Sequence, residues 1–165
     1  MANKQSFTPA EWTKVLESTM SVGMAISACD PSGLWGTLRE AFASRSALIT
    51  SKFVVSNELV KAVIADLETS GGRSTVQEAL HKHVDSAKPA EIVQRSLDHL
   101  REVSAILDDK APDDAAAFKV FLRGISQKVA EACVEGGFLG LGGVRVSDAE
   151  KVTLDDIAKA LGTTT

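Results

Sequence analysis

The sequence predicts an all-α protein, a single-domain bundle of six or seven helices that spans residues 1–165. Two capping boxes, Thr8–Glu11 and Ser147–Glu150, mark helix starts. Between them, apolar residues recur in long segments at spacings of three and four, the period of an amphipathic helix. Only the brief segment 143–146 shows the alternation of a strand. A chain of this length buries roughly 70% of its unfolded surface, which is enough for one core without a metal or disulfide.

The first helix is expected to begin after Thr8 and to end near Cys29. Proline follows the capping threonine at the first helical position, where its fixed φ is favourable. Phe7 precedes Trp12 by five residues, the spacing of a hydrophobic staple. Small side chains in the second half should keep this helix slim, namely Ser18, Ser21, Ser27 and Ala28.

Three shorter helices are expected next along the chain. The first covers 34–49, and the second begins at a cap supplied by either Ser56 or Asn57. The serine and two glycines of 70–72 should end the second helix, because glycine favours helix termination. The third then runs over 74–85. The apolar face of the second consists of Leu59, Val63, Ile64 and Leu67.

Two long amphipathic helices follow, one beginning at Pro89 and one after a break at Pro112. Proline is compatible with a first helical turn but not with a helix interior. The expected buried face of the first is Val93, Leu97, Leu100, Val103 and Leu107, and that of the second is Phe118, Leu122, Ile125, Val129 and Cys133. The last helix begins after Ser147 and should bury Leu154, Ile157, Ala158 and Leu161.

Composition argues against nucleic acid as a partner. The chain has 18 basic and 22 acidic residues, a net charge of -4, which is the wrong sign for neutralising phosphates. Its polar N-terminal stretch resembles no signal peptide, and no uncharged run is long enough for a transmembrane segment. Cys29 and Cys133 have small or apolar neighbours, as reduced buried thiols do. We therefore expect a cytoplasmic protein.

The glycine-rich stretch 135–150, EGGFLGLGGVRVSDAE, raises the possibility of a phosphate-binding loop. Gly137 and Gly142 have the required spacing, but Gly143 and Val144 occupy the positions of the essential lysine and serine or threonine. A dinucleotide fingerprint needs a preceding strand, and here a helix is expected. Both nucleotide interpretations fail.

The remaining interpretation of this stretch is a hinge between two helices. Its apolar side chains, Phe138, Leu139 and Leu141, are expected in the protein's own core, with a ligand pocket, a partner surface or a membrane contact as the alternatives. Arg145 could hold an anion beside the N-terminus of the last helix, where unpaired N–H groups point outward. The alternative is that Arg145 is a solvated neighbour of the helix cap.

Motifs for metal binding and catalysis are incomplete. Glu78 and His81 have the Glu-x-x-His spacing of a di-iron bundle, but such bundles need a second copy and two further glutamates. His81 and His83 lie about 200° apart around a helix, so a charged surface is the better interpretation. A Gly-x-Ser-x-Gly nucleophile elbow is absent. We expect neither an enzymatic activity nor a cofactor.

Two helix ends repeat at an offset of 104 residues. Ala-Cys-x-x-x-Gly-Leu-Trp-Gly at 28–36 matches Ala-Cys-x-x-x-Gly-Phe-Leu-Gly at 132–140. A duplicated, pseudo-symmetric bundle would explain the match, and chance or a shared way of ending a helix is the simpler alternative. If the repeat is real, Trp35 and Phe138 occupy equivalent positions.

The C-terminal segment resembles TerB-like helical domains, a bacterial group associated with tellurite resistance and stress. The resemblance rests on Val146-Ser147-x-x-Glu150, followed by Leu154, Ile157-Ala158 and Leu161-Gly162. It implies an all-helical fold and suspected metal ligands in an acidic turn before the Val-Ser pair. Residues 142–145 carry no acidic side chain there, so Asp30, in the one comparable acidic turn, is the metal ligand that the resemblance suggests.

Two functional hypotheses follow. The first is a non-catalytic interaction or stress-associated protein, which acts through a helical surface and forms a homodimer or binds another protein. The second is a small-ligand or metal-binding protein with a pocket near Trp35 and Phe138.

Overall fold

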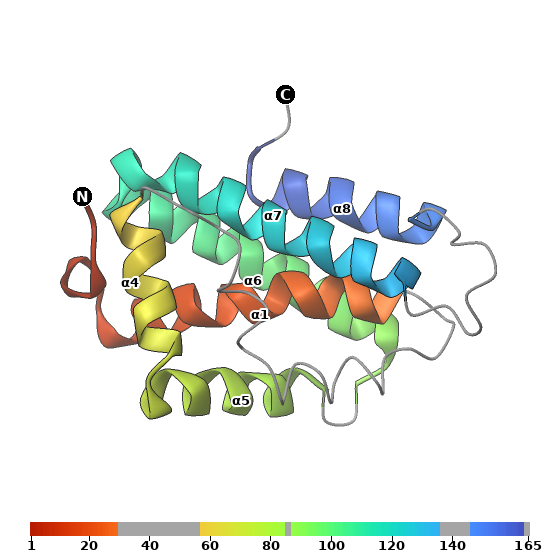
Figure 1. Ribbon diagram of the computed structural model, residues 1–165, viewed down its shortest axis with the longest axis horizontal. Helices are drawn as coiled ribbons and strands as arrows, with labels where there is room; N and C mark the ends of the chain where they lie inside the picture. The colour runs from red at the N-terminus through yellow and green to blue at the C-terminus, as the bar shows by residue number, and fades with distance from the viewer. Residues whose placement is uncertain (30–56, 85–86, 136–145, 164–165) are drawn as a thin grey trace.

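The computed structural model describes residues 1–29, 57–84, 87–135 and 146–163. These ranges contain six α-helices and one 3-10 turn, and no strand (Figure 1). The elements are η1 (Lys4–Ser6), α1 (Pro9–Cys29), α4 (Glu58–Leu67), α5 (Ser70–Val84), α6 (Pro89–Lys110), α7 (Pro112–Glu135) and α8 (Asp148–Ala160). The prediction of an all-α fold is confirmed. The helix expected over 34–49 lies outside the described residues.

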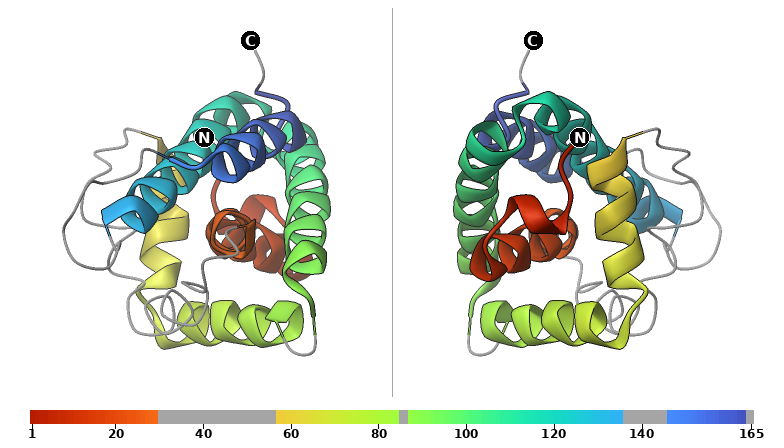
Figure 2. Two further views of the ribbon diagram at one scale, coloured as in Figure 1. Left: turned by 90° about the vertical axis from the view of Figure 1, so that its right-hand side faces the viewer. Right: turned by 90° about the vertical axis from the view of Figure 1, so that its left-hand side faces the viewer.

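Helix α1 occupies the centre of the bundle. In the two end views, α4 and α6 flank it, α5 lies on one side, and α7 and α8 lie on the opposite side (Figure 2). All five of these helices contact α1. Every residue of α1 from Ser18 to Ala28 is buried. The other helices therefore form a shell around α1.

Enclosure on all sides requires α1 to satisfy its own polar groups. The hydroxyls of Ser18, Thr19, Ser21 and Ser27 donate to backbone carbonyls three or four residues earlier, at 2.6, 2.8, 3.1 and 2.8 Å. Such back-bonding lets serine and threonine be buried without a penalty for unpaired groups. The small side chains predicted for the second half of this helix are therefore compatible with a dry interior.

The start of α1 is formed as the sequence predicts. Thr8 Oγ1 accepts from the Glu11 amide at 3.3 Å, and Glu11 Oε2 accepts from the Thr8 amide at 2.8 Å. The rings of Phe7 and Trp12 lie 5.7 Å apart, so the hydrophobic staple is also present. The helix ends at Cys29.

The boundary between α4 and α5 differs from the prediction. Asn57 is the cap of α4, since its side chain accepts from the Val60 amide at 3.1 Å. However, the two glycines do not separate the helices, because α5 already begins at Ser70. The turn lies at Thr69, whose hydroxyl accepts from the Gly72 amide at 3.0 Å. Gly71 and Gly72 therefore form the first turn of α5 instead of a break.

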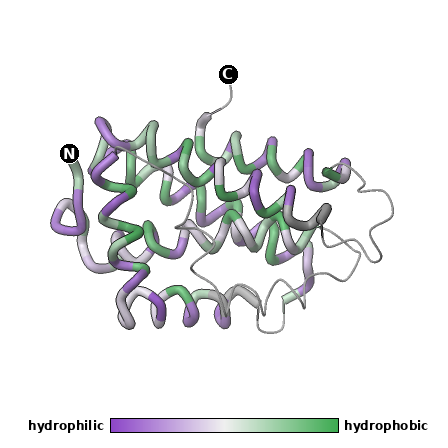
Figure 3. Tube along the Cα trace, viewed as in Figure 1, coloured by the Kyte–Doolittle hydropathy of each residue, from purple (hydrophilic) through white to green (hydrophobic). Residues whose placement is uncertain are grey.

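The remaining helices carry the expected starts and faces. Ser147 and Glu150 form the capping box of α8, with Glu150 N to Ser147 Oγ at 3.2 Å and Ser147 N to Glu150 Oε2 at 2.7 Å. Hydrophobic and hydrophilic segments alternate along α7 and α8, as amphipathic helices require (Figure 3). Most predicted core residues are buried, while Ile64, Val93, Val129 and Leu154 are only partly buried.

Candidate functional site

The predicted ligand and metal residues are not among those that the structure describes. Trp35, Phe138, Leu139, Leu141, Arg145 and Asp30 all lie in the ranges 30–56 and 136–145. The hinge, the pocket and the metal ligand therefore stay predictions.

The predicted repeat of two helix ends is described only in part. Cys29 is the last residue of α1, and Cys133 lies in the last turn of α7, which continues to Glu135. The two helices are packed differently, since α1 is buried throughout from Ser18 to Ala28 while α7 exposes Val120 and Arg123. A duplication would still have to account for that difference.

The described core contains a polar chain between α1 and α6. Nδ1 of His99 lies 2.7 Å from the Ser21 hydroxyl, and its Nε2 lies 3.8 Å from Oε2 of Glu17. Ser21 is 0% exposed and His99 9%. Glu17 and Ser21 are four residues apart, so one face of α1 presents both to the imidazole.

The hydrogen bonds of Ser21 favour a hydrogen on Nδ1 of His99. The serine hydroxyl has one hydrogen, and it donates to the Glu17 carbonyl at 3.1 Å. The 2.7 Å contact with the imidazole can be made at the same time when Nδ1 carries a hydrogen and donates to the serine oxygen. This assignment follows from the network and not from an observed hydrogen.

An ion pair lies one turn from this chain, nearer the surface. Lys14 Nζ and Glu102 Oε2 are 2.8 Å apart. The hydrogen bond and charge of Lys14 lower the pKa of Glu102, and His99 adds a smaller effect in the same direction. The contact between α1 and α6 thus becomes drier and less charged from Lys14 toward Ser21.

The Ser21–His99–Glu17 arrangement has the residue types of a nucleophilic triad but not its accessibility. A nucleophile must reach a substrate atom, and the hydroxyl of Ser21 is fully buried. It also donates to the carbonyl of its own helix at 3.1 Å. These three polar side chains are therefore suited to holding α1 and α6 together and not to attacking a ligand.

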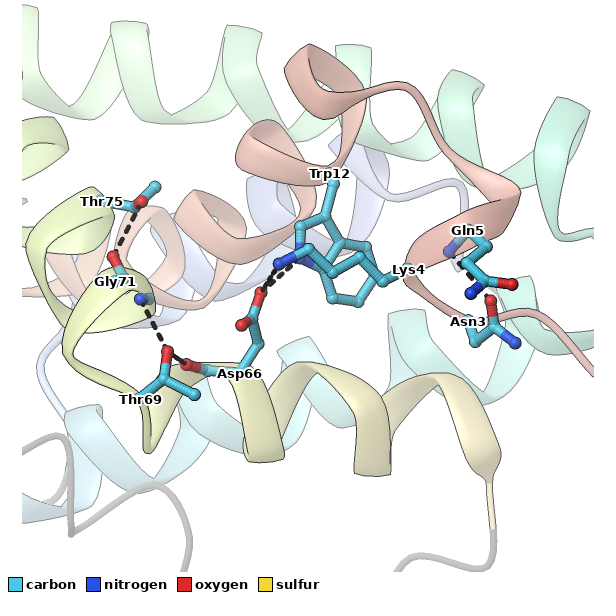
Figure 4. A network of polar contacts seen from close by, with 9 residues as sticks. Asn3, Lys4, Gln5, Trp12, Asp66, Thr69, Gly71 and Thr75 are labelled. Carbon is cyan, nitrogen blue, oxygen red and sulfur yellow. Dashed lines mark hydrogen bonds and ion pairs between the residues drawn. The ribbon is translucent and has the colours of Figure 1, made fainter.

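Asp66 is the centre of a second network, which joins four elements (Figure 4). Its Oδ2 accepts from Trp12 Nε1 at 2.6 Å and from Lys4 Nζ at 3.0 Å. Burial by itself would raise the pKa of Asp66, but the hydrogen bonds from Trp12 and Lys4 and the charge of Lys4 outweigh it and lower the pKa. The Asp66 carbonyl accepts from the Thr69 hydroxyl at 2.6 Å, which links the network to the start of α5.

A third network fastens the N-terminal segment to the bundle. Asp114, at the start of α7, is 6% exposed. Its two oxygens accept from the Ala2 amide at 2.5 Å and from Asn57 Nδ2 at 2.7 Å. The carboxylate thus connects α7 and the cap of α4 to the first residues of the chain.

The described histidine motif fits a surface better than a metal centre. Glu78 and His81 are both exposed on α5. Among the residues with described positions, no three His, Cys, Asp or Glu side chains come together as a metal would require. Within the same residues, none of the helices combines the length and apolar composition needed to cross a membrane.

Comparisons with models of known protein families, with curated proteins and with solved structures found no match.

Sequence reasoning missed the Ser21–His99 contact, although a signal for it exists. Leu100, Val103 and Leu107 form the buried stripe of α6, and His99 directly precedes it. A histidine beside an apolar stripe indicates a buried polar group that needs a partner. The partner lies 78 residues away in the sequence, so only the packing of α1 on α6 reveals it.

Proposed function

We propose that the protein acts without catalysis, through contacts between its helical surface and a second copy or another protein. The observation that supports this most is the burial of the Ser21–His99–Glu17 cluster. Ser21 is 0% exposed, so the one described cluster with the residue types of a triad gives no substrate access to its hydroxyl. Catalysis would need other residues.

The described surface also suits contacts with proteins better than contacts with nucleic acid. Exposed helix faces carry ion pairs between an acidic and a basic side chain three residues apart. These pairs are Glu58 with Lys61, Asp98 with Arg101 and Asp148 with Lys151. Such pairs leave a surface of mixed sign, which does not attract a phosphate backbone. The resemblance of residues 146–162 to TerB-like domains adds a stress association to the proposal, which growth on tellurite with and without the protein would test.

Native mass spectrometry of the protein, purified from cells under non-denaturing conditions and diluted over a concentration series, tests the proposal. We expect a dimer or a complex with a second protein. A monomer that carries a bound small mass would favour a ligand-binding protein with a pocket near Trp35 and Phe138 instead. A bare monomer at every concentration would contradict the interaction proposal.

The non-catalytic part has its own test. A hydrolase substrate screen should show no turnover above background with the wild-type chain. Turnover that disappears in Ser21→Ala, while the far-ultraviolet circular dichroism stays unchanged, would overturn this part of the proposal.

A further inference from the structure

Helices α1 and α6 run antiparallel where they touch. Lys14 contacts Glu102, and seven residues later Ser21 contacts His99, so the numbering rises along one helix and falls along the other. This pair of helices shares the most extensive contact between elements in the described structure.

Beyond the ion pair, the face of α1 that carries Ser21 includes two small side chains. Spacings of four and seven from Ser21 place Ala25 and Ala28 on this face, a spacing of three adds Met24, and all three are buried. At Ser21 and Ala25, sliding one helix by a turn exchanges one small group for another of similar size. Shape at these two positions therefore contributes little to the axial position of α6.

We propose that the hydrogen bond between Ser21 and His99 fixes the register of α6 on α1. A slip of one helical turn, about 5.4 Å, toward the end of α1 would bring the imidazole beside the methyl group of Ala25. The ring nitrogen that faces Ser21 at 2.7 Å would lose that hydroxyl inside a dry contact. Burial of a polar atom without a hydrogen bond is unfavourable, so the slipped register is disfavoured.

A slip of one turn in the opposite direction would carry the imidazole from Ser21 to the level of Glu17, whose Oε2 already lies 3.8 Å from Nε2. In this direction the loss of the Ser21 hydroxyl acts together with the separation of Lys14 from Glu102, which now lie 2.8 Å apart. The ion pair alone is a weaker determinant, because its side chains are 44% and 59% exposed and are screened by water and salt. A single buried polar contact fixes register in the same way in coiled coils.

The register can be measured as the distance between two spin labels. Ala10 on α1 and Ala90 on α6 are both exposed, and they are offset along the helix axes, so an axial slip changes the distance between them. Nitroxide labels at these positions, in a background with Cys29→Ala and Cys133→Ala, give a distance distribution by pulsed electron paramagnetic resonance. We expect one narrow peak when Ser21 and His99 are intact.

The double variant Ser21→Ala/His99→Leu should keep the helices but allow α6 to take more than one axial position on α1. The expected result is a broadened distribution or a second population displaced by about 5 Å, one helical turn. The matched control, Lys14→Ala/Glu102→Ala, removes the exposed ion pair next to the same contact and should keep the narrow peak. If the double apolar variant does not fold, Ser21→Ala in the same labelled background should show the broadening.

Two results would overturn the proposal. One is an unchanged narrow peak after Ser21 and His99 are both replaced, since the register would then be specified elsewhere. The other is a broad distribution in the parent, since the hydrogen bond would then select no single register.

Discussion

At the scale of single residues, Gly72 is required by close approach between two helices. A Cβ atom at this position would lie 2.0 Å from the carbonyl oxygen of Asp66 and 2.6 Å from its carbonyl carbon. Both atoms belong to the backbone, so the obstruction cannot be relieved by a side-chain rotation. The last turn of α4 and the first turn of α5 approach this closely only because position 72 has no side chain.

Gly72→Ala should therefore destabilise the protein by about 1–3 kcal/mol, the usual cost of overpacking. Gly71→Ala is the matched control, because the nearest atom to its Cβ would be Thr69 Oγ1 at 3.9 Å. Alanine is the better helix former, so that variant should be neutral or more stable by up to about 1 kcal/mol. Urea unfolding of both variants measures the difference, and equal stabilities would show that α4 and α5 are not in close contact at Gly72.

Asp66 should contribute to the acid sensitivity of the fold. Its pKa in the folded protein is lowered, whereas the unfolded chain should titrate near the ordinary value of about 3.9. The stability that the carboxylate contributes is therefore fully present above the unfolded pKa and is lost as the pH falls through the folded pKa. Urea unfolding between pH 7 and pH 3 should show a smaller acid-induced loss in Asp66→Asn than in the wild type.

Trp12→Phe provides a graded comparison for the same effect, since it removes one donor and keeps the carboxylate. Its pH profile should lie between those of the wild type and Asp66→Asn. Identical profiles for all three proteins would show that the network around Asp66 makes no contribution to the pH dependence.

At the scale of elements, α6 and α7 are joined by an ion pair with one buried and one exposed partner. Lys119 Nζ lies 2.7 Å from Asp108 Oδ1 and 2.8 Å from Oδ2. The lysine side chain is 9% exposed, whereas that of the aspartate is 59% exposed. Loss of the lysine lets Asp108 return to water, but loss of the aspartate leaves a buried ammonium group.

Asp108→Ala should therefore cost about 1–3 kcal/mol, and Lys119→Met should stay within about 1 kcal/mol of the wild type. Asp109→Ala is the control for removal of a charge, since Asp109 contacts Lys110 in an exposed pair that contributes little. Thermal and urea unfolding measure all three. A larger loss in Lys119→Met than in Asp108→Ala would contradict the assignment of the lysine as the buried partner.

At the scale of the whole molecule, stability depends on the central position of α1. Ile26 is 0% exposed in a helix that touches all five other described α-helices. Ile26→Ala should cost about 2–5 kcal/mol, because the surrounding helices cannot all collapse into the vacated space. Val152 on α8 is 60% exposed, so Val152→Ala should change stability by no more than about 0.5 kcal/mol. Similar effects from the two truncations would contradict a central α1.

The sequence by itself determined the helical fold of the described chain and the starts of most of its helices. The capping boxes at Thr8 and Ser147 and the prolines at 89 and 112 are local signals, because cap and backbone preferences act within a few residues. They located the starts of α1, α6, α7 and α8. The local rule was wrong at 70–72, where the Thr69 hydroxyl accepts from the Gly72 amide and both glycines lie in the first turn of α5.

Only the tertiary structure decided which helix is central and which polar groups meet. Periodicity shows that a helix has an apolar face, but it does not show how many neighbours cover that helix, and the small side chains of α1 do not reveal that every residue from Ser18 to Ala28 is buried. Ser21 with His99, Trp12 with Asp66, and Ala2 with Asp114 are separated by 78, 54 and 112 residues. Hydrogen bonds between such distant residues depend on how helices dock, and docking follows from the fit of whole surfaces and not from any local pattern.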